Sequence, residues 1–177
     1  MAKYAKAIAR EIGLTEEKIL EIETAAFIHD IGKIGIPDRV LNKNGPLTDS
    51  EWLEMRKHPE YGKEILEKAD NTFKELIPYV YLHHERYDGK GYPKGIKNTM
   101  IPIAIISVAD AFDAMTSNRS YRKRMTVADA KEEIVKNSGT QFHPEVVKAL
   151  INILEGDTEL FSFQESDQMV VGNLKIN

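Results

Sequence analysis

Four of the five histidines in the chain lie in short segments that also carry Asp, Lys or Glu. These segments are residues 29–33, 58–60 and 83–85, and residues 110–113 add two further carboxylates. Imidazole nitrogens and carboxylate oxygens are the groups that hold divalent transition metals in proteins. A site built from all of them therefore requires a fold in which several helices, far apart in the sequence, bring these side chains to one point.

Size and charge limit the classes of protein to consider. A chain of 177 residues is about one domain long and can bury a core without disulfides. The net charge of −4 argues against binding a nucleic-acid polymer or an anionic membrane. The absence of Cys removes thiol ligands and fits a reducing compartment, so a cytoplasmic location is expected. The longest apolar runs, such as residues 101–109, are too short to span a bilayer, and no leader peptide is recognised.

The pattern of apolar residues predicts an all-α fold without paired strands. Gly13 is expected to end a first helix, and Thr15 to cap a second. Thr48 and Glu51 form a capping-box pattern at the start of a third. Thr126 is expected to cap a late helix. Further helices are expected from Pro59 and over residues 77–84, 101–115 and 144–153, with loops over residues 36–46 and 88–93.

The adjacent pair His29-Asp30 can supply two ligands only if the backbone departs from a regular helix there, since neighbours in a helix point about 100° apart. The alternative is a capping Asp beside a core His. Lys33 lies one turn after His29, and its ammonium is suited to a phosphate oxygen beside metals rather than to metal itself.

The other segments differ in how strongly each of them indicates a metal site. His83-His84 is uncommon as core filler late in an apolar helix, whereas His58-Pro59 alone is more typical of a helix start. Asp110 follows an apolar run, and a carboxylate there is costly unless it is ion-paired or bound to metal. Asp113 lies one turn further on the same side.

Taken together, the residues of these segments and the order of the segments along the chain resemble the HD-GYP subgroup of the HD-domain phosphohydrolases. The resemblance covers residues 1–153. It rests on His29-Asp30-Ile31-Gly32-Lys33, His58-Pro59-Glu60-Tyr61-Gly62, His83-His84-Glu85 with the following Arg86-Tyr87-Asp88-Gly89-Lys90-Gly91-Tyr92-Pro93, Ala109-Asp110-Ala111-Phe112-Asp113-Ala114 and Arg119-Ser120-Tyr121-Arg122.

The resemblance implies an HD-domain helical bundle with additional C-terminal helices. It implies hydrolysis of cyclic di-GMP to pGpG, GMP or both, with two or three divalent ions of iron or manganese. Lys33 and Asp30 are the implied catalytic residues, and Lys33, Asp113, Arg119 and Arg122 are the implied substrate contacts. The implied metal ligands are His29, Asp30, His58, His83, His84 and Asp110.

The loop Gly91-Tyr92-Pro93 is interpreted as a rigid exposed lip, through which a GGDEF-type or other signalling protein could dock, or as a plain surface turn. His143-Pro144 is expected to open the last helix, without a metal role.

One departure concerns the start of the chain. The family usually places a further His, sometimes with a Glu one turn before it, just upstream of the segment that reads here as Ala2-Lys3-Tyr4-Ala5. Residues 1–155 are therefore expected to form the domain without the start of its first helix, and residues 156–177 a tail packed on it or not. A two-ion site could persist, and a homodimer could compensate for the shorter helix. Two alternatives stay open: a catalytically impaired cyclic di-GMP-binding or protein-docking module, and an HD hydrolase acting on another nucleotide.

Overall fold

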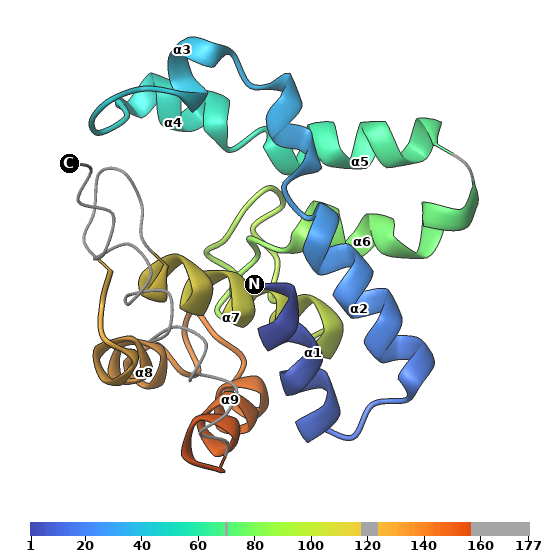
Figure 1. Cartoon of the computed structure of the whole chain (residues 1–177). Coiled ribbons are helices and arrows are strands. Elements are labelled where there is room, and N and C mark those ends of the chain that lie inside the picture. Colours follow the sequence, from blue (N-terminus) through green and yellow to red (C-terminus); the bar gives the residue numbers. More distant parts are fainter. Residues whose placement is uncertain (70, 118–123, 157–177) are drawn as a thin grey trace, which may run out of the picture.

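The computed structural model of the chain describes residues 1–69, 71–117 and 124–156, which form a helical domain (Figure 1). These stretches contain no β-strand, which confirms the predicted all-α class, and no helix in them has the length and hydropathy to cross a bilayer. The helices are α1 (Ala2–Glu11), α2 (Glu16–Ile28), α3 (Asp38–Leu41), α4 (Asp49–Met55), α5 (His58–Lys68), α6 (Ile77–Leu82), α7 (Ile101–Thr116), α8 (Val127–Lys136) and α9 (Pro144–Gly156), with two 3-10 helices, η1 (Ile31–Gly35) and η2 (Asn71–Leu76).

Local capping signals set several helix ends where the sequence placed them. The Thr15 and Thr126 hydroxyls each accept a hydrogen bond from a backbone N–H three residues later. Thr48 and Glu51 form the complete capping box. Gly13 takes a φ of 83° after α1, a conformation that a residue with a Cβ adopts only with strain. These ends depend on neighbouring residues alone, and sequence patterns therefore locate them.

Two expected boundaries were wrong. Residues 36–46 were predicted to be a loop, but α3 lies inside them, started by Pro37 and stabilised by the buried Val40. A single turn is too short to show helical periodicity in sequence. The helix predicted over residues 77–84 ends at Leu82. His83 caps it, and the His83 ring hydrogen-bonds to a carbonyl oxygen of the last turn.

Helix α7 lies at the centre of the core and packs against α1, α2, α6, α8 and α9 (Figure 1). It is buried on most sides, as its nearly continuous apolar sequence requires. On α1, the ring of Tyr4 meets that of Phe112 edge-on, with centroids 5.1 Å apart. This contact fixes the position of α7 relative to α1, and with it the position of Asp110. The fully buried α7 side chains include Ile103, Ile105, Ile106, Val108 and Phe112.

The close packing of η1 on α5, and of α5 on α6, depends on one glycine each. A Cβ on Gly32 would lie 1.9 Å from the carbonyl oxygen of His58 and 2.3 Å from the amide nitrogen of Gly62. A Cβ on Gly62 would lie 2.8 Å from a methyl group of Val80 on α6. Glycine therefore allows the backbones of η1 and α5 to meet and Val80 of α6 to pack on α5, which brings the residues next to Gly32 against the start of α5.

We expect Gly32→Ala to lower the free energy of unfolding by about 3 kcal/mol, because the new methyl group overlaps rigid backbone on α5. Denaturant unfolding of the metal-free chain measures the change. Gly156→Ala is the matched control, since its added Cβ meets no atom within 4 Å. Equal stability of the Gly32→Ala variant and the parent chain would contradict the predicted clash.

Candidate metal centre

Three imidazoles are oriented by the ends of three helices. His29 and His83 cap α2 and α6, and His58 follows the end of α4. Each ring directs Nδ1 at a carbonyl oxygen three residues earlier, in the last turn of a helix, where backbone acceptors lack a partner within the helix. In the neutral rings Nδ1 therefore carries the proton and Nε2 keeps a lone pair. The acceptors are Ala26, Met55 and Val80, at 2.8, 2.8 and 2.7 Å.

The Nε2 atoms converge. Those of His58 and His83 lie 3.4 Å apart, and that of His84 lies 3.2 Å from His58. One ligand atom from each of these histidines and from Asp30 falls within 4.8 Å of the others. With Nδ1 protonated on His58 and His83, two lone pairs face each other across 3.4 Å in a buried site, which is unfavourable. A cation between them would replace this repulsion with attraction, so the geometry fits a metal ion.

A second group of ligands adjoins the first and shares Asp30. Asp30 leaves the helical conformation, with φ −98° and ψ 9°, which is the departure that the His29-Asp30 pair requires. Its Oδ1 lies 3.3 Å from His58 Nε2, while its Oδ2 lies 3.2 Å from His29 Nε2. Asp110 Oδ1 approaches the same nitrogen of His29, at 3.6 Å. His29 Nε2 is buried and makes no hydrogen bond with any residue in the described stretches. Without its proton, this nitrogen would offer a lone pair beside two carboxylates, so the position also fits a cation.

The histidines of the cluster form two groups, because the pKa of one is raised and the pKa values of the others are lowered. Burial opposes a charge on His29, but the carboxylates of Asp110 and Asp30 outweigh it and raise its pKa to about 9. Burial lowers the pKa of His83 to about 3, helped by the charge of His29. Burial also lowers the pKa values of His58 and His84. At neutral pH, without a metal ion, His29 therefore carries a second ring proton, on Nε2, next to the carboxylates and the Nε2 lone pairs of the other histidines.

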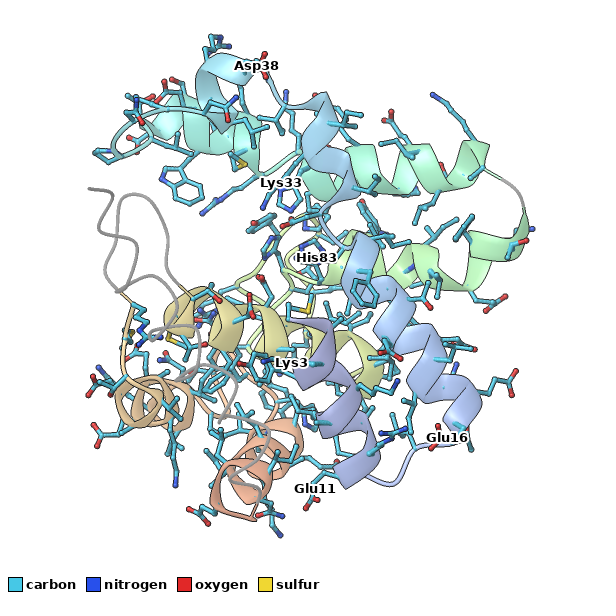
Figure 2. All side chains as sticks on the ribbon, in the orientation of Figure 1. Lys3, Glu11, Glu16, Lys33, Asp38 and His83 are labelled. Carbon is cyan, nitrogen blue, oxygen red and sulfur yellow. The ribbon has the colours of Figure 1, made fainter. Side chains whose placement is uncertain are left out.

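Lys33 is adjacent to this cluster, on η1 (Figure 2). Its Nζ lies 2.6 Å from Asp30 Oδ2, in an i,i+3 ion pair. Burial alone would raise the pKa of Asp30, but His29 and Lys33 together hold that pKa well below its usual range. Because Asp30 also belongs to the group with His58, His83 and His84, its ion pair with Lys33 brings a cationic donor next to neutral imidazoles.

Glu85 has a role that the sequence patterns did not predict. Its side chain is buried, and its carboxylate accepts hydrogen bonds from three consecutive backbone N–H groups, those of Lys94, Gly95 and Ile96, at 2.6, 3.0 and 3.1 Å. The residue therefore holds the loop after α6 instead of a metal. A partial signal was present, since a glycine-rich loop exposes N–H groups that need an acceptor, and Glu85 and Asp88 are the two carboxylates that closely precede it.

The loop holds Tyr92 against the cluster, so the interpretation of this segment as an exposed lip was wrong at Tyr92. The Tyr92 ring stacks on His84 with centroids 4.6 Å apart and an interplanar angle of 27°. The Arg56 guanidinium lies 5.3 Å from the centre of the same ring. Gly91 permits this approach, because a Cβ there would lie 2.5 Å from the His84 carbonyl oxygen. Tyr92 therefore limits the orientation of His84.

Of the other predicted site residues, Asp113 is the one within the described stretches, and it is not in the cluster. Asp113 lies one turn after Asp110 on α7, and its Oδ1 accepts a hydrogen bond from the amino group of Met1 at 2.7 Å. Arg119 and Arg122 lie outside the described residues. His143 accepts a hydrogen bond from the Glu145 N–H at 3.3 Å, which confirms that it opens α9 as a cap.

Comparisons with known proteins agree with the fold and the motifs. Residues 1–146 match the HD domain family. A cyclic di-GMP phosphodiesterase of Thermotoga maritima is 43% identical over 164 residues, which are 91% of this chain and 44% of that protein. A 3'3'-cGAMP-specific phosphodiesterase of Vibrio cholerae is 38% identical over 154 residues, covering 85% of this chain and 30% of that protein. The chain thus spans less than half the length of both relatives.

A solved structure gives the same fold. The HDG"Y"P protein of Bdellovibrio bacteriovorus aligns with a TM-score of 0.68 over 88% of this chain and 50% of that one, at 22% sequence identity. At this identity the similarity supports the helical architecture, including the helices that follow the bundle.

Metal binding should displace the proton of His29, because Nε2 is its only nitrogen facing the cluster. Because the carboxylates of Asp110 and Asp30 raise the pKa of His29 to about 9, this histidine stays mostly protonated between pH 7 and 8.5, and each pH unit weakens the competition from the proton by about tenfold. We expect the Kd for Mn²⁺ to fall by about tenfold per pH unit over that range. Calorimetric titration in buffers of different ionisation enthalpy measures both the Kd and the proton release. His143→Gln is the control, with an unchanged slope, and a Kd independent of pH would contradict the prediction.

We expect Glu85→Gln to destabilise the domain by about 2 kcal/mol, since the amide group presents a donor to N–H groups that need an acceptor. Because the loop then no longer holds Tyr92 on His84, Mn²⁺ affinity should fall at least about tenfold. Denaturant unfolding and metal titration measure the two effects. Glu60→Gln, an exposed position near the start of α5, is the control. A variant with parental stability and affinity would show that the loop is held by other contacts.

Proposed function

The chain belongs to the HD domain family, in its HD-GYP branch, and from this premise we propose that it is a metal-dependent phosphodiesterase that hydrolyses cyclic di-GMP to pGpG, GMP or both. The observation that carries the proposal is the convergence of imidazole Nε2 lone pairs on the carboxylate of Asp30, beside the ammonium of Lys33. This combination suits the hydrolysis of a phosphodiester, which needs both cationic charge and an activated water.

We propose two ion positions. His58, His83 and His84 would hold one ion, and His29 with Asp110 the other, while the two oxygens of Asp30 serve both. Mixed imidazole and carboxylate ligands suit iron or manganese. When bound, such ions acidify water and neutralise charge on phosphoryl oxygens. A third ion would require ligands beyond these six.

Lys33 would bind the phosphate. Its ammonium has three N–H donors, and the ion pair with Asp30 uses one of them. Asp30 thereby holds the Lys33 side chain beside the cluster before substrate arrives. The remaining donors are available to a non-bridging phosphate oxygen, where negative charge increases during attack at phosphorus. Asp30 thus has a positioning role as well as its role as a ligand.

A mixed cyclic dinucleotide is the second candidate substrate, because the Vibrio cholerae relative is named as specific for 3'3'-cGAMP. The phosphodiester chemistry would be the same. The alternative of a non-catalytic binding or docking module is not favoured, since relatives similar over most of this chain are named phosphodiesterases.

Other predicted features stay predictions. They are substrate contacts by Asp113, Arg119 and Arg122, a homodimer, a cytoplasmic location and a GGDEF-type partner at the Gly91-Tyr92-Pro93 loop. Because Tyr92 faces His84, a partner at this loop would meet the neighbouring exposed Lys94 rather than the tyrosine ring.

We expect Lys33→Ala to lower kcat on cyclic di-GMP by about 100- to 1,000-fold, because it removes a donor to the charged phosphoryl group. Metal content should be unchanged. The protein is loaded anaerobically with Mn²⁺ or Fe²⁺, metal content is measured by elemental analysis, and nucleotides are followed by chromatography. Lys63→Ala is the control, since Lys63 pairs with Glu67 on α5.

Three outcomes would change the assignment. A fully metal-loaded chain that turns over no cyclic dinucleotide would defeat the proposed phosphodiesterase activity. Tight binding of cyclic di-GMP without hydrolysis would restore the binding-module alternative. Faster turnover of 3'3'-cGAMP than of cyclic di-GMP would assign the second candidate substrate.

A further inference from the structure

A cavity of about 580 Å³ adjoins the proposed metal centre. Lys33 and His58 line one part of it, which places the cavity directly beside the position proposed for the phosphate. Its volume is in the range of sites that bind small molecules. The rest of the wall is largely apolar. It includes Leu41, Leu47, Trp52 and Met55.

The apolar wall is not explained by packing of the core. Helix α4, which carries Trp52 and Met55, has seven residues and none of them is buried. Polar contacts hold this segment instead, because the Arg39 guanidinium donates to both carboxylate oxygens of Glu54 at 2.8 Å and Lys43 pairs with Glu51. Trp52 is 49% exposed. A single exposed apolar residue needs no explanation, but several that line one hollow beside a charged site indicate a ligand.

We propose that this cavity is a nucleobase subsite, in which a purine of the substrate stacks on the indole of Trp52 while its phosphate meets Lys33 and the metal centre. The inference rests on the proposed function and extends it to the recognition of the base. Stacking on an aromatic side chain suits any base, because every base has a π face, and the flat indole is partly exposed to receive one.

The position of the Lys33 charge in the cavity favours a nucleotide over a purely apolar ligand. Lys33 provides a cation at one part of the cavity, while Leu41, Leu47 and Met55 provide only apolar surface elsewhere. A ligand that fills this space therefore combines a flat, weakly polar ring with a nearby anion. A nucleoside monophosphate has this arrangement, with the base and the phosphate joined by one sugar.

Trp52 is the single tryptophan of the chain, so intrinsic indole fluorescence reports on the surroundings of this one residue. The probes are GMP and ribose 5-phosphate, added to the metal-loaded chain at constant metal concentration, with excitation at the red edge of indole absorption. We expect GMP to quench the fluorescence saturably. Ribose 5-phosphate should leave it unchanged, since it supplies the phosphate without a base.

Substitutions test the stacking directly. Trp52→Ala should raise the calorimetric Kd for GMP and the KM for cyclic di-GMP by about 10- to 100-fold, and Trp52→Phe should recover most of the loss. Leu53→Ala is the matched control. Leu53 is on the same helix and 64% exposed, but it does not line the cavity, so both constants should stay at the parental values.

The outcomes separate this inference from the proposed function. GMP that leaves the fluorescence unchanged, or a Trp52→Ala variant whose constants stay within about twofold of the parent, overturns the subsite. Turnover of cyclic di-GMP by the parent chain without quenching means that the subsite is wrong and the phosphodiesterase stands. Quenching by GMP without turnover means that the subsite stands and the proposed activity fails.

Discussion

The hydrogen bond from an imidazole Nδ1 to a carbonyl in the last turn of a helix underlies the organisation of this site. It occurs at His29, His58 and His83, at three different helix ends. Each bond satisfies a backbone acceptor that the helix leaves unpaired, and each leaves the lone pair of Nε2 facing inward. The candidate metal centre is thus the common meeting point of three helix ends. Its ligands are oriented by the same contacts that accompany those ends.

Close backbone packing brings the helix ends together. Gly32 allows η1 and α5 to approach at a distance that a Cβ would prevent, Gly62 does the same for α5 and Val80 of α6, and α7 supplies Asp110 from the middle of the core. Glu85 then organises the loop that places Tyr92 on His84. The buried Glu85 carboxylate is paired with backbone N–H groups, which leaves the imidazoles and the two aspartates as the groups facing the site.

The described helices are held in two ways: those around α7 by apolar packing, and α4 at the edge of the domain by polar contacts. Helix α7 has apolar neighbours on nearly every side, whereas α4 buries no side chain and is held by its capping box and ion pairs. Apolar side chains on such a rim gain nothing from the core. Their collection around the cavity beside Lys33 is understandable if a ligand covers them.

The apolar run of α7 and the caps at Thr15, Thr48 and Thr126 were enough to predict an all-α fold, because these signals depend on local sequence. The HD-type fold and the residues of the cluster were predicted through the resemblance of the ordered segments to the HD-GYP subgroup. Helix ends failed where a tertiary contact decided them, as at His83. The inward turn of Tyr92, the loop-holding role of Glu85 and the cavity around Trp52 were decided only by the tertiary structure. Which side chains face one another depends on how separate helices pack, and no local pattern records that packing.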